Sequence, residues 1–468
     1  MGGQESKQDG QLWQMFTSSE KENIHKMFVR IVGSQHALSE PFLKKYAPSW
    51  FLPKDRLWSA MSDCHVNTGH VRDKKLSEDQ FGGFLALALK GTYAEKAEIL
   101  SLLSGTVGSQ VHMGKLYQAV FSIVKSYLEL SSSDSANKTW KCETGDEDIS
   151  RLCLDCLALQ SVPEDGGTGP QGGSGGQYQD SYEVEAWVSK SPLFLRMFDR
   201  VMYNLFPVID KDSIASTFQS FLPVITNVDW SSTYTILDIV SISYLNHHIP
   251  RQHQATWRLL YSNSIHGDSF SQLTRFMVGK GPTVMIVKDK DGHVFGGYVS
   301  ESWEIRPNFY GDSTCFLFTL KPRLGVYMAT GYNENFVYLN QGQETLPNGL
   351  GFGGQLNYFG MWIDYSFNSG HSKAKPKCTT YGSPQLSGSP EFVVDHLEVW
   401  AVGPEKKKND SDDEDDAKTS ILDKDSGAKA ILELAGRKHH SEGLRELRED
   451  EEMTDEMKRK MNTIPKLL

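Results

Sequence analysis

The chain has 468 residues, 39% of them hydrophobic, a length that allows about two to four domains at roughly 100–200 residues each. Its 48 basic and 59 acidic residues give a net charge of −11, which argues against a nucleic-acid-binding protein because such proteins present basic surfaces to phosphate. The six cysteines are sparse and follow no secretory signal, so reduced thiols are expected, and no apolar run reaches the ~20 residues of a membrane-spanning helix.

The chain begins with a lipidation pattern. Residues 1–6 (MGGQES) fit M-G-x-x-x-[ST], which predicts N-myristoylation of Gly2 within a flexible stretch, 1–16. One myristoyl chain binds a membrane weakly and reversibly. No cysteine precedes Cys64 and no basic cluster lies nearby, so we expect a weak tether that a protein partner must reinforce.

Residues 17–158 are predicted to be helical. Ile24, Phe28 and Ile31 are spaced as on one helix face, residues 77–80 (SEDQ) read as a capping box, and further helices are expected near 94–103 and 113–130. The last two flank 104–115, which has the length of an EF-hand loop but carries Lys115 where calcium needs a glutamate. Two interpretations remain: a degenerate EF-hand-like scaffold without calcium, or a plain helical bundle.

Two segments read as linkers. Residues 159–181 are glycine-rich and predict a flexible linker, and 404–419 combine a lysine run with an acidic run, which is typical of disorder. A helical segment is expected at 182–234. Its core candidates are Trp187, Leu193, Phe194, Met197, Phe198, Met202 and Phe206. The lone pair Cys153 and Cys156 lacks the further ligands of a zinc site, so neither a metal nor a redox role is predicted.

Residues 235–403 alternate strand-like runs with turn signals. A helix near 237–246 comes first, and 290–292 (KDG) reads as a hairpin turn. The expected strands are 283–287, 293–299, 315–319, 326–328, 337–339 and 361–364. This pattern predicts a two-sheet β-sandwich with flanking helices, and the whole chain is therefore assigned to the α+β class.

Several motifs of this segment resemble the TLDc-domain family in their order and spacing. They are 257–261 (WRLLY), 266–270 (HGDSF), 291–297 (DGHVFGG), Trp303, Gly311, 316–318 (FLF), 349–354 (GLGFGG), 378–381 (CTTY) and 397–400 (LEVW). Residues 420–423 (SILD), 440–445 (HSEGLR) and the N-terminal glycine extend the likeness to mTOR-associated, lysosome-linked members of the family. The resemblance implies the vacuolar proton pump (V-ATPase) and mTOR pathway components as partners. It also implies a location in the cytoplasm and on the cytoplasmic face of the lysosomal membrane.

Two short motifs match patterns of nucleotide-binding and catalytic sites but lack the context that such sites need. Residues 349–354 match G-x-G-x-x-G, but no strand–helix context surrounds them, so we expect a tight glycine loop and no nucleotide cofactor. Residues 266–269 (HGDS) adjoin in sequence, which does not assemble a catalytic triad, and they are expected to cap the next helix. Glu398 stands between apolar neighbours on a strand and should face outward, as a contact residue, or else be a polar core residue.

Residues 420–468 are predicted to form a C-terminal helical tail. Its apolar stripe supplies the candidate partner-binding residues Ile431, Leu432, Ala435, Leu444 and Leu447. A helix this short is marginal alone, so it either packs on its own domain or enters a partner's groove. We favour the partner, because a charged linker precedes it.

The leading functional hypothesis is a non-enzymatic adaptor or regulator, held at the lysosomal membrane surface through Gly2, that binds the V-ATPase and supports mTOR signalling. The alternative is an enzyme or a factor protecting against oxidative stress, roles linked to other TLDc proteins. A third reading is a calcium-responsive scaffold. No catalytic residue, cofactor or metal site is predicted.

Overall fold

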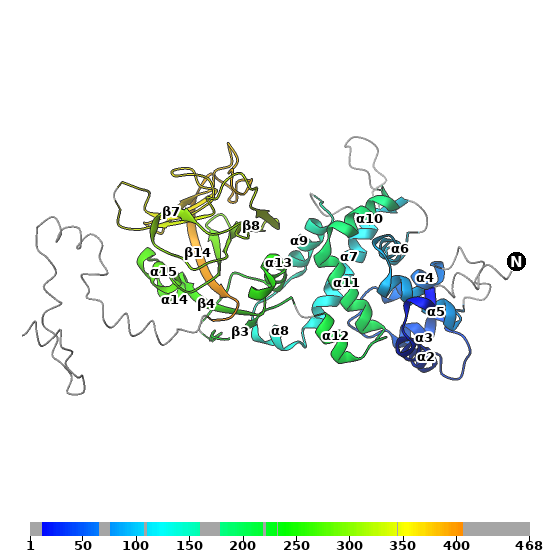
Figure 1. Cartoon of the computed structure of the whole chain (residues 1–468). Coiled ribbons are helices and arrows are strands. Elements are labelled where there is room, and N and C mark those ends of the chain that lie inside the picture. The colour runs from blue at the N-terminus through cyan, green and yellow to red at the C-terminus, as the bar shows by residue number, and fades with distance from the viewer. Residues whose placement is uncertain are drawn as a thin grey trace, which may run out of the picture. The chain divides into compact units, whose positions relative to one another are not determined.

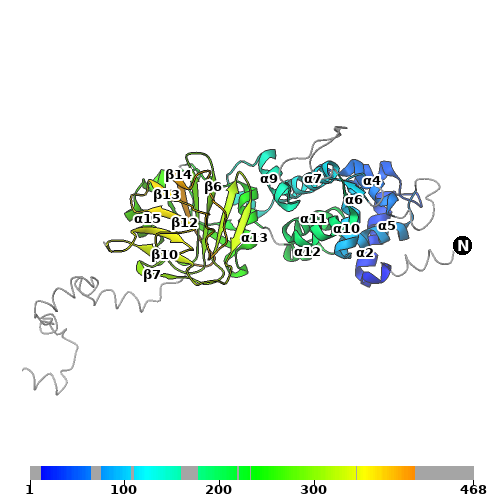
Figure 2. The same cartoon turned by 90° about the horizontal axis from the view of Figure 1, so that it is seen from above.

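A computed structural model describes residues 12–64, 75–106, 110–159, 178–218, 221–231, 233–343 and 345–405, shown in two views (Figure 1, Figure 2). Helices occupy the first half, and a large, mainly antiparallel sheet the second, which confirms the α+β class. Gly2 and the five tail residues predicted to bind a partner lie outside the described residues.

The first half is built from helices of five to nineteen residues. They are α2 (Ser18–Val32), α3 (Glu40–Tyr46), α4 (Lys54–Asp63), α5 (Glu78–Leu85), α6 (Tyr93–Leu103), α7 (Met113–Ser131), α8 (Ser135–Thr139), α9 (Asp146–Cys156), α10 (Ser181–Lys190), α11 (Pro192–Leu205) and α12 (Lys211–Thr217), with a 3-10 turn η1 (Trp13–Met15) and a π-helical turn η3 (Ala86–Lys90).

Local sequence explains where these helices begin. Thr17 and Ser77 each accept a hydrogen bond from the backbone three residues on, in the reciprocal capping boxes that start α2 and α5. The predicted stripe Ile24, Phe28 and Ile31 is buried. Of the core candidates in the later helices, six are buried and Trp187 is partly buried against the same core.

A short strand pair connects the starts of two helices, α7 and α10. Strand β1 (Gln110–His112) leads directly into α7, and β2 (Tyr178–Asp180) leads into α10; the strands pair antiparallel with Val111 opposite Gln179.

Among the described residues no group of three acidic, histidine or cysteine side chains could hold a metal ion. The EF-hand-like interpretation stays a prediction.

An unusual contact fastens the start of the described chain. The Trp13 ring lies against Gly82 in α5, where an added Cβ would sit 2.4 Å from Trp13 Cζ2. Glycine inside a helix costs about 1 kcal/mol relative to alanine, so propensity alone favours alanine here. The glycine makes room for the indole.

Replacing Gly82 by alanine is therefore expected to lower the free energy of unfolding by about 1–3 kcal/mol, because overpacking outweighs the gain in helix propensity. Urea unfolding followed by circular dichroism measures this. The same substitution in a Trp13→Ala background should be neutral or stabilising. An equal loss in both backgrounds would show that the contact is not the cause.

The second half is a sheet of twelve strands with four short helices. Its strands are β3 (Val224–Ile225), β4 (Thr256–Ser262), β5 (Thr283–Asp289), β6 (Val294–Val299), β7 (Arg306–Tyr310), β8 (Phe316–Lys321), β9 (Gly325–Met328), β10 (Val337–Asn340), β11 (Gly349–Phe352), β12 (Met361–Asp364), β13 (Ser369–His371) and β14 (Glu391–Val402). Its helices are α13 (Ile239–His248), η4 (Arg251–His253), α14 (Asn263–His266) and α15 (Phe270–Met277).

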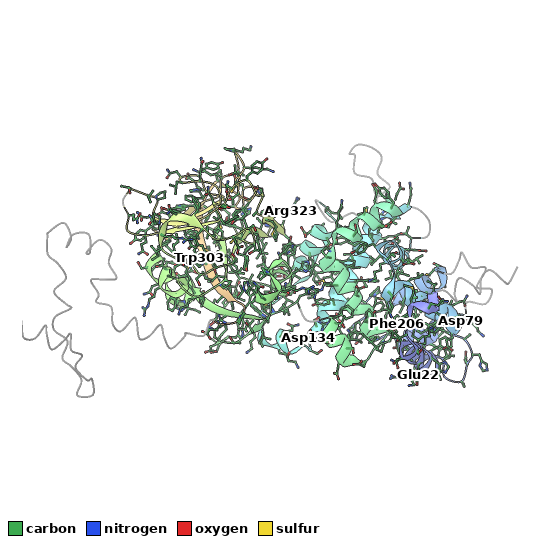
Figure 3. All side chains as sticks on the ribbon, viewed as in Figure 1. Glu22, Asp79, Asp134, Phe206, Trp303 and Arg323 are labelled. Carbon is green, nitrogen blue, oxygen red and sulfur yellow. The ribbon has the colours of Figure 1, made fainter. Side chains whose placement is uncertain are left out.

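The sheet is continuous and not the two separate sheets expected. Its order is β7-β10-β11-β12-β13-β14-β5-β6-β8-β9, with β4 also on β14 and β3 parallel to β4. The long strand β14 joins the halves, because its first residues pair with β13 and the rest with β5 and β4. The halves still pack face to face: the Phe352 ring fills the space above Gly297, and Trp303 lies 5.6 Å from it, centroid to centroid. Figure 3 labels Trp303 among the strands and Phe206 among the helices.

One further sequence expectation in this half was wrong, and one open alternative is settled. Residues 349–352 form strand β11 and not a loop; Gly353 and Gly354 after it take the left-handed φ values of a tight turn, 67° and 80°. The Phe359 ring lies over Gly351, so the missing side chain admits an aromatic. Of the two positions left open for Glu398, the structure shows the polar core one, because the residue is fully buried and does not face outward.

Candidate functional site

The best-defined polar cluster lies where α9 meets the sheet. Arg151 is buried, and its Nη1 donates to the carbonyl oxygen of Leu320 in β8 at 2.5 Å. Its Nη2 donates to Asp148 Oδ1 at 2.6 Å and to Asp238 Oδ2 at 2.7 Å. One guanidinium thus ties the helical half to the strand and to the start of α13.

Each acid of this cluster has a second structural task. Asp238 caps α13 by accepting from the backbone N–H and the hydroxyl of Ser241. Asp148 accepts from the backbone N–H of Gly145 at the start of α9. Burial opposes its ionisation, but the hydrogen bonds from Arg151 and Gly145 outweigh it, and the pKa of Asp148 lies below its usual value.

Glu398 of β14 is the second buried node. Its carboxylate accepts from the Thr235 hydroxyl at 2.8 Å, from the Ile236 backbone N–H at 2.9 Å and from Trp400 Nε1 at 2.9 Å. His396 Nε2 lies 3.4 Å from the same carboxylate. Three donors satisfy the charge, so Glu398 anchors the segment before α13 to the sheet.

Four tryptophans add apolar contacts between the helical half and the sheet. Trp140, just after α8, lies 5.3 Å from Trp400, 5.9 Å from Trp257 and 6.1 Å from Trp230, measured between ring centroids. Its Nε1 donates to the Pro223 carbonyl at 2.8 Å. A residue of the helical half thus packs into the sheet's aromatic core, and the described residues up to Glu405 belong to one compact unit.

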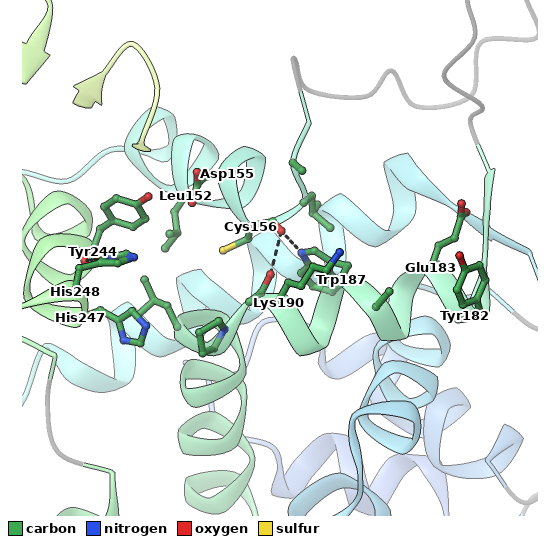
Figure 4. A pocket seen from close by; sticks show the side chains of 16 residues that line it. Leu152, Asp155, Cys156, Tyr182, Glu183, Trp187, Lys190, Tyr244, His247 and His248 are labelled. Carbon is green, nitrogen blue, oxygen red and sulfur yellow. Dashed lines mark hydrogen bonds between the residues drawn. The ribbon is translucent and has the colours of Figure 1, made fainter. Parts of the chain in front are cut away.

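A cleft of about 470 Å³ opens between α9, α10 and α13 (Figure 4). Its walls carry Asp155, Lys190, Tyr244, His247 and His248. At its floor the Cys156 carbonyl accepts from Trp187 Nε1 and from the Ser191 hydroxyl. The volume falls within the ~300–1,000 Å³ range of small-molecule pockets.

Burial shifts the pKa values of three titratable groups in the cleft toward the neutral form. Burial, with the neighbouring His248 and Arg196, lowers the pKa of His247 to about 4, and burial lowers that of His248. Burial raises the pKa of Asp155 to about 6, although one side of the residue faces solvent. Neutral imidazoles beside a carboxyl offer hydrogen bonds to a polar ligand.

The residues 266–269 do not form a catalytic array. His266 Nδ1 pairs with the Ser262 backbone, Asp268 accepts from Asn263 Nδ2, and Ser269 caps α15 by accepting from the Gln272 N–H. The capping interpretation is confirmed.

The thiols with shifted pKa values are poor nucleophiles. Burial raises the pKa of Cys142 to about 12 and also raises those of Cys153, Cys156 and Cys315. Raised values leave little thiolate at neutral pH. None of the six cysteines is in a disulfide.

The sequence did not single out the Arg151 cluster or the Trp140 contact. Arg151 stands beside the buried Leu152 and Cys153, and only its interruption of that apolar run hinted at an internal role. Within the described ranges, no helix combines the length and apolarity needed to cross a bilayer.

Comparison with known proteins agrees with the fold. The family model of the TLDc domain matches residues 230–403. MTOR-associated protein MEAK7 of Gallus gallus is 41% identical over 393 residues, covering 81% of this chain and 80% of the relative, and that of Homo sapiens is 38% identical, covering 85% and 86%. Oxidation resistance protein 1 of Rattus norvegicus is 35% identical over 162 residues, which is 34% of this chain and 18% of that protein.

The likeness to MTOR-associated protein MEAK7 extends far beyond the TLDc segment, through most of both chains, whereas the likeness to oxidation resistance protein 1 covers about a third of this one. The chain therefore belongs to the family of MTOR-associated protein MEAK7, with a TLDc domain at residues 230–403.

Proposed function

We propose that this chain is a non-enzymatic adaptor, recruited through a lipid on Gly2 to the cytoplasmic face of the lysosomal membrane, that binds the V-ATPase and supports mTOR signalling. The observation that carries the proposal is the extent of the likeness: relatives named for their association with MTOR match over more than 80% of this chain. The V-ATPase comes from the resemblance of the motifs to TLDc proteins.

The chemistry of the buried polar groups supports an adaptor. Arg151, Asp238 and Glu398 each use their hydrogen bonds on backbone groups and neighbouring side chains inside the protein. Side chains used in this way hold elements together, whereas a general acid or base needs a proton position open to substrate. The α9 cleft offers hydrogen bonds without a nucleophile–base pair among the contacts described.

The second candidate is protection against oxidative stress. Similarity to oxidation resistance protein 1 over the TLDc segment favours it. If that role used thiol chemistry, it would need an accessible thiolate, and the raised pKa values of Cys142, Cys153, Cys156 and Cys315 weigh against these four. We therefore rank it below the adaptor.

The proposal is tested by co-purification with solubilised V-ATPase. The full chain is expected to retain the pump, and a chain stopped before Ser420 to lose it if the tail is the clasp. Retention by both would place the contact in the TLDc domain. A Gly2→Ala chain should bind the solubilised pump normally but should no longer be found at lysosomal membranes in cells. Failure of the full chain to retain the pump contradicts the proposal.

A further inference from the structure

Three neighbouring loops at one end of the sandwich form a surface with an unusual composition. They are residues 329–335, 353–360 and 372–380, which we call the loop face. The loop at 372–380 carries Lys373, Lys375 and Lys377, whereas Glu334 is the one acidic residue in the three loops. This local excess of positive charge stands against a chain whose net charge is −11.

Hydrogen bonds hold these loops together. The Thr330 backbone N–H donates to the Thr380 carbonyl at 2.8 Å, and Asn333 Nδ2 donates to Thr379 Oγ1 at 2.8 Å. The Tyr358 hydroxyl donates to the Pro376 carbonyl at 2.5 Å, directly between two of the lysines. These hydrogen bonds hold the backbone of the lysine-bearing loop in one conformation against the other two loops.

The lysines themselves are open to solvent. Lys375 and Lys377 are exposed and Lys373 is half-buried, and none of the three is in an ion pair among the described residues. The acidic groups known to face this region are Glu334 on the adjacent loop, and Asp364 and Glu391, which like Lys373 act on the pKa of His371. An unpaired ammonium on a loop is available to an external anion.

Exposed apolar groups accompany this charge. Tyr332 is 86% exposed and Leu356 38% exposed. Each lies on a loop bonded to its neighbours. Amphipathic rings beside basic groups suit the headgroup region of a bilayer, where tyrosine is enriched and lysine meets anionic lipid.

We propose that the loop face binds an anionic lipid surface and supplies the second membrane signal that a lone myristoyl chain lacks. The inference rests on the proposed recruitment to a membrane, because one acyl chain gives only marginal binding and a basic patch is a common complement. The choice of a bilayer over an acidic protein follows from that need and from the solvent-exposed Tyr332 and Leu356 beside the lysines.

The test uses the full chain made without its N-terminal lipid, and vesicles of phosphatidylcholine with and without phosphatidylserine. The chain should sediment with the phosphatidylserine vesicles, and less so as salt rises. The variant Lys373→Gln/Lys375→Gln/Lys377→Gln should partition about a hundredfold more weakly, since each basic residue near such a surface strengthens binding severalfold.

A matched control removes the same charge elsewhere. Lys138, Lys141 and Lys280 are exposed, and their replacement by glutamine should leave partitioning within about twofold, since a distant charge is screened. Both variants should unfold at the same denaturant concentration as the parent chain, because the altered side chains lie at the surface.

Three results would overturn the inference. They are equal vesicle binding by the two triple variants, no preference of the parent chain for phosphatidylserine, and a loop-face variant that loses V-ATPase co-purification while its vesicle binding is unchanged. The last would make the loop face a protein contact. The vesicle assay contains neither lipidated chain nor pump, so its failure leaves the adaptor proposal standing. Likewise, failure of co-purification leaves the vesicle result intact.

Discussion

Replacing Trp140 by alanine is expected to lower the free energy of unfolding by about 3–5 kcal/mol, the cost of emptying a large aromatic site in a packed core. Trp140 is 5% exposed, and its ring contacts three other tryptophans. The loss would also leave the Pro223 carbonyl without its indole donor. Urea unfolding followed by tryptophan fluorescence measures the change.

The same variant tests whether the two halves unfold together. Because Trp140 belongs to the helical half and Trp257 and Trp400 to the sheet, a joint core predicts one transition shifted to lower urea for both helix and sheet signals. Trp140→Phe keeps a ring and should lose distinctly less. An unchanged midpoint, or a shift of the helical signal alone, would contradict the coupling.

Replacing Arg151 by methionine is expected to destabilise the chain by about 3–5 kcal/mol, because removing one partner leaves the buried Asp238 carboxylate without its counter-charge, whereas Asp148 keeps Lys321 at 3.7 Å. Asp238 is buried and would keep only its bonds to Ser241. Leu320 would lose its donor as well. A matched control is Lys125→Met, which removes a cation paired with the exposed Asp146 and should cost at most about 1 kcal/mol.

The pH dependence separates this charge effect from lost packing. The pKa of Asp148 is lowered in the folded chain, so its stabilisation is present above the carboxyl's unfolded pKa and is lost as pH falls through the folded value. Without Arg151 the folded pKa rises toward or above the unfolded value. The variant's deficit should therefore be largest at neutral pH and shrink in acid. A deficit that is constant with pH would indicate packing alone.

Regular periodicity was enough to predict several of the longer helices and six of the strands. The apolar spacing of Ile24, Phe28 and Ile31 and the cap at Ser77 are local, since a helix satisfies its backbone within a few residues. The strands β5, β6, β8, β10 and β12 are likewise recognisable in the sequence as apolar runs between turns. Glycine-rich β11 did not, because its strand conformation depends on pairing with β10 and β12 and on Phe359 lying over Gly351.

The amino-acid sequence by itself determined the fold class, the main helices and strands, and the family resemblance of the 257–400 motifs, because these depend on local periodicity and residue identity. The tertiary structure alone decided what the polar and aromatic residues do. Arg151 meets Leu320 across 169 positions, Glu398 meets Thr235 across 163, and Trp140 packs against Trp400 from another half of the chain. Such partners are chosen by packing between distant segments, and no local pattern encodes them. The same reason explains why the strand neighbours of Glu398 left both an outward and a core position open, whereas the structure buries it against the segment that precedes α13.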